Sequence, residues 1–263
     1  MEKGISFYFG FDIRPKLRAK MIKEAGFDCV ITNADKRFNR QNGSIAKQVK
    51  LFRKNGLKLS SLHMSYKSDE LHYFWEEGKF GEKLKKNLIK DIKTAHKYGF
   101  RCVVVHVDGK YSKIGEKRLL EILDICDKLK VPIAIENLNN NRILLFDIFK
   151  NIKSNMLKFC YDSGHNNAFD KDFDYLSKLS GELYTLHLHD NDGKADLHTI
   201  SKICATVDWD YIAKELVKNK EIPLDYELLN KKENSLTAGE FLQEAFIQAN
   251  LFEYKINNVN TNQ

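Results

Sequence analysis

The sequence has few of the residues that divide a chain into separate segments. Only 3 Pro and 14 Gly occur in 263 residues, so no low-complexity linker is expected. No apolar run approaches the roughly 20 residues of a membrane-spanning helix, and no small-residue cleavage pattern follows the N-terminal apolar patch. The 5 Cys are odd in number and lack CxxC spacing, which favours reduced thiols and a cytoplasmic protein.

Glycine-rich phosphate-binding motifs are also missing. Neither GxGxxG nor GxxxxGK[ST] follows the first predicted strand, which argues against a nucleotide-binding Rossmann or P-loop protein. Hydrophobic residues make up 43% and charged residues 30%, the balance of a soluble globular chain and not of a disordered or fibrous one. With 43 basic and 36 acidic residues the net charge is +7, which permits an anionic partner but does not require one.

A repeated pattern predicts alternating helices and strands. Amphipathic stretches end at a turn residue and lead into short apolar runs, as at Gly26, Gly56 and Gly99, where glycine suits a left-handed helix cap. Eight strand candidates alternate with helical stretches at roughly 15–25, 44–55, 82–98, 115–130, 142–153, 171–179, 208–219 and 238–250. We therefore predict a single α/β domain, a (β/α)8 TIM barrel over residues 1–253, followed by a frayed tail at 254–263. An open doubly wound sheet is the alternative.

Histidines and carboxylates gather where the predicted strands end. In barrels of this kind the chemistry lies at the C-terminal ends of the strands. The residues at or just past those ends include His63, His106, Glu136, Asp162, His165, His187, His189, Asp196, His198 and Glu227. Carboxylates crowded together without a cation would repel one another, and mixed imidazole and carboxylate ligands suit Zn²⁺ or Mn²⁺. The pattern predicts a divalent metal ion at the mouth of the barrel.

Two short runs carry a resemblance to a known family. The run YDSGH at 161–165 and the run HLHDNDG at 187–193 resemble the xylose isomerase-like barrel superfamily, which contains sugar isomerases and epimerases together with endonuclease IV. The resemblance covers nearly the whole chain and is strongest to bacterial sugar phosphate isomerase/epimerase proteins. It implies an isomerase or epimerase with a small carbohydrate substrate.

The ketose epimerases of this superfamily imply roles for particular residues. By that resemblance, the metal ligands are Glu136, Asp162, His187 and Glu227. Glu136 and Glu227 would also exchange the substrate proton, one on each face of a cis-enediolate. His189 competes with His187, because strand alternation points both to one side, and the His-x-x-Asp spacing favours His187. His165 would hydrogen-bond a substrate oxygen.

Endonuclease IV supplies a second hypothesis, a zinc phosphodiesterase acting on abasic DNA with three zinc ions. Its ligand types are all matched in order, at His63, His106, Glu136, Asp162, His165, His187, Asp196, His198 and Glu227. In a one-metal enzyme, the residues outside the metal set would contact substrate instead, namely His63, His106, His165, Asp196 and His198. The predicted loops at the mouth hold 16 basic and 15 acidic residues. Because DNA enzymes concentrate basic residues there, a small substrate is favoured over nucleic acid.

Three further features have more than one interpretation. The long insertion at 64–81 is rich in aromatic residues and predicts either a lid over a sugar ring or a segment packed on the barrel rim. Asp208, before Trp209, predicts a helix N-cap. A barrel that binds sugar without turning it over is disfavoured, because both Glu136 and Glu227 are present. The sequence does not decide between a monomer and a homo-oligomer.

Overall fold

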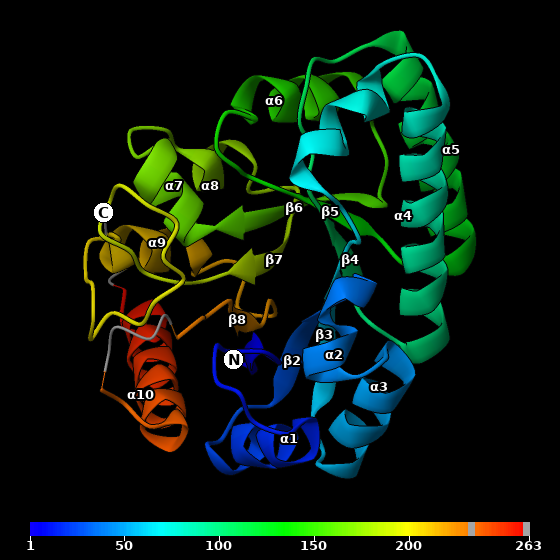
Figure 1. Cartoon of the computed structure of the whole chain (residues 1–263). Helices are drawn as coiled ribbons and strands as arrows, with labels where there is room; N and C mark the ends of the chain where they lie inside the picture. The colour runs from blue at the N-terminus through cyan, green and yellow to red at the C-terminus, as the bar shows by residue number, and fades with distance from the viewer. Residues whose placement is uncertain (231–234, 260–263) are drawn as a thin grey trace.

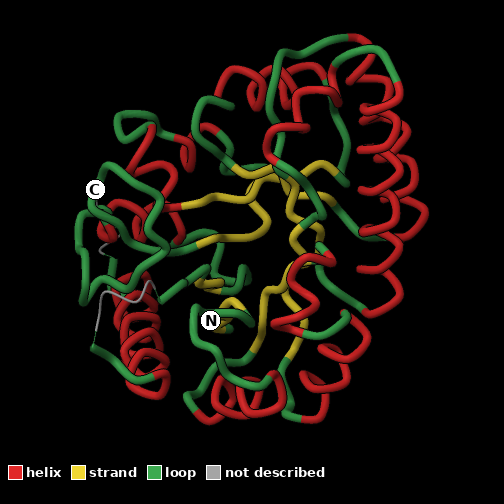
Figure 2. The backbone as a smooth tube through the Cα atoms, in the orientation of Figure 1, coloured by secondary structure: helices red, strands yellow, loops and turns green. Residues whose placement is uncertain are grey.

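The strands form a parallel barrel, as predicted. The computed structural model describes residues 1–230 and 235–259. Its strands are β1 (Lys3–Ser6), β2 (Cys29–Asn33), β3 (Lys58–His63), β4 (Cys102–Val105), β5 (Ile133–Glu136), β6 (Leu157–Asp162), β7 (Leu183–His187) and β8 (Leu224–Tyr226). Neighbours run in the order β7-β6-β5-β4-β3-β2-β1-β8. Figure 2 shows these strands as a ring surrounded by helices.

The ring closes between β7 and β8 through a contact between the residue just after β7 and the last residue of β8. Leu188 pairs with Tyr226 in an isolated parallel bridge. The Leu188 N–H donates to the Asp225 carbonyl at 2.8 Å, and the Glu227 N–H donates to the Leu188 carbonyl at 3.1 Å. The (β/α)8 prediction is therefore confirmed, and the open doubly wound sheet is wrong.

Helices cover the outside of the barrel (Figure 1). They are α1 (Pro15–Glu24), α2 (Asn39–Asn42), α3 (Ile45–Lys54), α4 (Lys79–Tyr98), α5 (Lys113–Leu129), α6 (Arg142–Asn151), α7 (Ser163–Phe169), α8 (Tyr175–Lys178), α9 (Trp209–Leu216) and α10 (Ala238–Asn257), with 3-10 helices η1 (Lys36–Phe38) and η2 (Ser68–Trp75). The Asp208 side chain accepts a hydrogen bond from the Tyr211 N–H, which confirms the N-cap. In the described ranges, no helix is apolar over a length that could cross a bilayer.

The tail prediction is wrong at its start. Helix α10 continues to Asn257, so a boundary after residue 253 falls within a helix. The reason is packing, because Phe252 and Ile256 lie four residues apart on the same helix face and are both buried. The last part of the predicted tail, 260–263, lies outside the described residues.

The aromatic insertion packs on the rim over its η2 part. The buried Arg118 guanidinium donates to the carbonyls of Phe74 and Glu76, both at 2.6 Å. Trp75 is buried, and a Cβ on Gly115 would lie 2.0 Å from its ring. Tyr66 differs, because its ring centre lies 4.5 Å from that of His106 at the mouth. The packing interpretation fits η2, whereas the Tyr66 ring lies against the histidines at the mouth.

A buried carboxylate lies inside the barrel below its mouth. Asp225 is fully buried and accepts hydrogen bonds from the hydroxyls of Ser60 and Thr185. A Cβ on Gly4 would lie 1.9 Å from Asp225 Oδ1, so this strand needs glycine there. Burial, opposed by the Ser60 hydrogen bond, raises the pKa of Asp225 to about 6.

Replacing Asp225 by Asn should stabilise the protein at alkaline pH relative to the wild type. The folded pKa lies above the value of about 3.9 in an unfolded chain, so the stability linked to Asp225 protonation is present below about pH 4 and lost as pH rises through about 6, roughly 2–3 kcal/mol. Thermal unfolding at about pH 5 and about pH 8, with chelator present, measures this. The Tm difference should shift in favour of Asp225→Asn at the higher pH, and a constant difference would contradict the argument.

Candidate metal centre

Four residues converge from consecutive strands at the mouth of the barrel. Glu136, Asp162 and His187 are the last residues of β5, β6 and β7, and Glu227 follows β8 directly. Parallel strands bring these ends to one edge, with Asp162 and His187 paired in register. One ligand atom from each of the four lies within 4.8 Å of the others. We call this set the central group.

The central group leaves buried polar atoms without hydrogen-bond partners. His187 Nδ1 lies 3.2 Å from Glu136 Oε2 and 3.0 Å from Glu227 Oε2. Among the described residues, neither His187 Nδ1 nor Glu136 Oε1 has a hydrogen bond of normal geometry. Buried polar atoms without partners are costly and uncommon. A divalent ion would satisfy both atoms, and the donor set suits Zn²⁺ or Mn²⁺, so the residues fit the metal that the sequence predicts.

A second group adjoins the central group at Glu136. His63, His106 and Glu136 offer ligand atoms within 4.8 Å of one another. His63 Nε2 lies 3.0 Å from His106 Nε2, and His106 Nε2 lies 3.1 Å from Glu136 Oε2. Burial lowers the pKa of His106, which favours the neutral imidazole that a metal ion needs.

A third group lies on the other side of Asp162. His165, Asp196 and His198 offer ligand atoms within 4.8 Å of one another. Asp196 Oδ2 lies 3.0 Å from His198 Nε2 and 3.4 Å from His165 Nε2. The structure thus brings every site residue predicted from the sequence into one of three adjoining groups.

His189 lies outside these groups. Strand β7 ends at His187, so the alternation that would place both histidines on one side does not continue. His189 Nε2 lies 3.1 Å from Asp162 Oδ1, and its ring stacks on His198 with centres 4.1 Å apart. His189 therefore orients a carboxylate of the central group, as outer partners of metal ligands do.

Gly164→Ala should disturb this contact. A Cβ at Gly164 would lie 1.9 Å from His189 Cε1, so the His189 ring would have to move away from Asp162. We expect a loss of about 1–3 kcal/mol in stability and about 10–100-fold in metal affinity, measured by thermal unfolding and chelator competition. Gly181→Ala is the matched control, because no atom lies within 4 Å of its Cβ. Equal effects of the two changes would contradict this assignment.

Two outer residues were not identified from the sequence. Asn137 donates from Nδ2 to the Asp162 carbonyl at 2.9 Å and accepts from the Asp162 N–H at 2.7 Å. Asp190 accepts from Ser201 Oγ at 2.8 Å and from Trp209 Nε1 at 2.9 Å. The Asn after Glu136 and the His-x-x-Asp spacing were the available signals. Asp190 holds the loop that follows β7 against the barrel.

Histidines and carboxylates within the site shift each other's pKa values. Burial alone would raise the pKa of Glu136, but His187 and His106 hold that pKa well below its usual value. Burial alone would lower the pKa of His198, but Asp196 and Glu227 raise that pKa to about 9. An ion binding to these groups must displace their protons, so metal affinity is coupled to pH.

Together, the closed parallel barrel and the histidines and carboxylates at its strand ends indicate a TIM barrel protein with a polar site at the mouth of the barrel. The chain belongs to the xylose isomerase-like TIM barrel family, whose profile matches residues 19–245. It is 29% identical over 175 residues to the uncharacterized protein y4fM of Sinorhizobium fredii, a match covering 59% of this chain and 55% of that protein. The match thus spans about half the length of that relative.

Solved structures share the fold at low sequence identity. D-Psicose 3-epimerase from Clostridium cellulolyticum, solved with D-tagatose, superposes with a TM-score of 0.74 at 15% identity, covering 97% of this chain and 99% of that chain. The TTHB071 protein from Thermus thermophilus, soaked with ZnCl2, gives 0.68 at 14% identity and covers 99% of both chains. These likenesses show the fold.

Proposed function

We propose that the chain is a divalent-metal-dependent isomerase or epimerase of a small sugar or sugar derivative. One observation carries the proposal, namely that the carboxylates of Glu136 and Glu227 both lie within 3.2 Å of His187 Nδ1 in the central group. Epimerisation through an enediolate needs two acid–base groups beside one activated carbon. A divalent ion held by the central group would polarise the carbonyl and adjacent hydroxyl of the sugar as a Lewis acid.

The protein's own residues would move the proton. His187 lowers the pKa of both Glu136 and Glu227, so both are ionised at neutral pH and either can act as a base. One ionised carboxylate would take the proton from the carbon beside the carbonyl. The other, after taking up a proton from solvent, would give that proton to the opposite face, so the pair carries one proton before and after the step. His165, with Nδ1 3.3 Å from Glu136 Oε1, would hydrogen-bond a substrate oxygen.

The reaction types of the structural neighbours support the same proposal. One neighbour is named as a D-psicose 3-epimerase, which is the reaction class proposed here, and another was soaked with a zinc salt. Zn²⁺ or Mn²⁺ is the proposed cofactor, and a small carbohydrate the proposed partner. All five cysteines are free, which supports a cytoplasmic location.

Solvent exchange tests the proposal directly. The zinc- or manganese-loaded protein is incubated in D₂O with a panel of ketoses and aldoses, and deuterium incorporation beside the carbonyl is followed by NMR. We expect exchange on at least one sugar, because the proton taken by a carboxylate equilibrates with solvent. A fully loaded protein that exchanges no member of a broad panel would count against the proposal.

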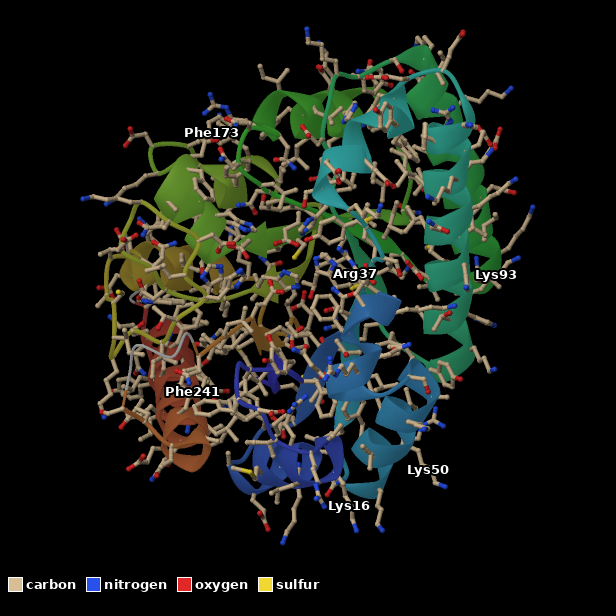
Figure 3. The ribbon with its side chains drawn as sticks, in the orientation of Figure 1. Lys16, Arg37, Lys50, Lys93, Phe173 and Phe241 are labelled. Atoms are coloured by element: carbon tan, nitrogen blue, oxygen red, sulfur yellow. The ribbon has the colours of Figure 1, made fainter. Side chains whose placement is uncertain are left out.

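Phosphodiester hydrolysis is a second candidate, favoured by one observation. The three adjoining ligand groups contain all nine residues of the larger zinc pattern, more than a one-ion enzyme needs. The basic residues near the mouth argue against a DNA substrate. Arg37 is paired with Asp35 and Arg142 with Asp170, both at 2.6 Å, and Lys16, Lys50 and Lys93 point away from the barrel mouth (Figure 3). Cleavage of an abasic-site duplex would favour this candidate.

A further inference from the structure

A pocket of about 140 Å³ adjoins the central group on the side of β1, β2 and β8. His63, His187 and Glu227 form its inner end. Among the residues that the structure describes, the rest of the lining carries no charged side chain. Phe7, Phe38 and Leu229 give it apolar wall, while Ser6, Asn33 and Asn42 offer hydroxyl and amide groups. This is the mixed lining that suits a hydroxylated carbon chain, whose C–H groups pack on rings and whose hydroxyls need partners.

A buried arginine stands behind this wall but does not line the pocket. Arg18 is 1% exposed, donates from Nη1 to Asn42 Oδ1 at 2.7 Å and from Nη2 to the Ile13 carbonyl at 2.8 Å. Its guanidinium lies 5.1 Å from the Phe7 ring centre and 5.0 Å from that of Tyr8. Because Asn42 gives its oxygen to Arg18, its NH₂ is the group it can offer a ligand.

Arg37, which precedes the pocket residue Phe38, also has its side chain in contacts with other protein groups. Arg37 pairs with the Asp35 carboxylate at 2.6 Å, and it donates a hydrogen bond to the Tyr66 carbonyl. A phosphate placed in the part of the pocket away from the central group would therefore lose its water without gaining an arginine or lysine from the described lining. Burying a charge without a paired partner is strongly unfavourable.

We propose that this pocket selects an uncharged sugar, so that the substrate is unphosphorylated. The inference rests on the proposed isomerase function and narrows its substrate class. The volume of about 140 Å³ is about ten times the roughly 10–15 Å³ that a single water needs, which is room for a short hydroxylated carbon segment. The reacting carbons lie at the Glu227 end, and the rest of the chain extends between Phe38 and Asn42.

Matched pairs of sugars test the selection. Ketoses and their terminal phosphate esters are compared by deuterium exchange on the metal-loaded protein, and we expect kcat/KM to be at least about 100-fold higher for the neutral member. The same pairs are titrated by calorimetry, with inorganic phosphate as a separate probe of ligation at the metal itself. Phe38→Ala removes part of the apolar wall, and Phe80→Ala, a similarly exposed phenylalanine on α4, is the matched control.

The outcomes separate this inference from the proposed function. Three results together support the inference: neutral sugars bind, their binding is weakened by Phe38→Ala but not by Phe80→Ala, and their phosphate esters bind no more tightly than inorganic phosphate. These results support the inference even if no proton exchange occurs, in which case only the isomerase proposal fails. An ester that is turned over faster than its neutral sugar, or bound more tightly than both that sugar and inorganic phosphate, overturns the inference. The inference is also overturned if no neutral sugar binds, or if the affinity for neutral sugars is unchanged in Phe38→Ala.

Discussion

Glu227→Gln should lower kcat for sugar proton exchange by roughly 10²–10⁴-fold at saturating metal. The amide has nearly the shape of the carboxylate but cannot accept the substrate proton. Glu227 lies 3.0 Å from His187 Nδ1 and lines the pocket beside the central group, so the change falls where the proposed substrate would react. The measurement is the rate of deuterium incorporation by NMR, with metal content determined on the same sample.

The control separates loss of a base from loss of charge. Glu221→Gln removes the same charge from an exposed position before β8 and should leave kcat unchanged. The metal content of Glu227→Gln should stay near one ion per chain when metal is in excess, because the amide oxygen remains a donor. A Glu227→Gln protein with wild-type kcat and full metal would remove Glu227 from the proton-transfer step.

His187→Ala should weaken metal binding more than any change outside the central group. Losing an outer partner of a ligand typically costs about 10–100-fold in metal affinity, so losing His187 itself should cost more than about 100-fold. Elemental analysis of protein purified without chelator or a metal-binding tag gives ions per chain. His96→Ala, which alters a histidine on α4 bonded to the Leu129 carbonyl, should change nothing.

The same measurement distinguishes the two candidate functions. If the protein is a one-ion isomerase, His198→Ala keeps the ion and affects only turnover. If it is a multi-ion phosphodiesterase, the wild type holds two or three ions and His198→Ala loses one, because His198 belongs to the third group. A wild type that stays metal-free after loading with Zn²⁺ or Mn²⁺ would contradict both.

The barrel was predictable from the sequence because each of its units is local. Short apolar runs define each strand within a few residues, and turn glycines precede three of them, at Gly26, Gly56 and Gly99. Asp208 caps α9 with a bond to the Tyr211 N–H only three residues away. The convergence of these residues was predictable because every strand end lies at the same edge of a parallel barrel. Strand position alone placed Glu136, Asp162 and His187 at that edge, whereas the family resemblance supplied their expected roles as metal ligands.

What was missed depends on contacts between distant segments. The η2 aromatics are fixed by Arg118, which bonds the Phe74 carbonyl from 44 residues away. Asn137 holds the backbone of Asp162 across two strands, a pairing that no spacing shows. The C-terminal helix was underestimated because the burial of Ile256 depends on packing against segments distant in the sequence.

The barrel closes where β7 meets β8, the two end strands of the sheet. Two residues of the central group, His187 and Glu227, lie at this closure. Among the described residues, β7 and β8 are linked by the Leu188–Tyr226 bridge with its two backbone hydrogen bonds and by the hydrogen bond from Thr185 to Asp225. The bridge residues are the sequence neighbours of His187 and Glu227. A cation shared by those two side chains would connect the two ends of the ring. Its binding free energy would then add to the free energy of folding. The ion would thereby also serve as a structural cross-link between the strand ends, and its removal by a chelator would lower the stability of the barrel where β7 meets β8.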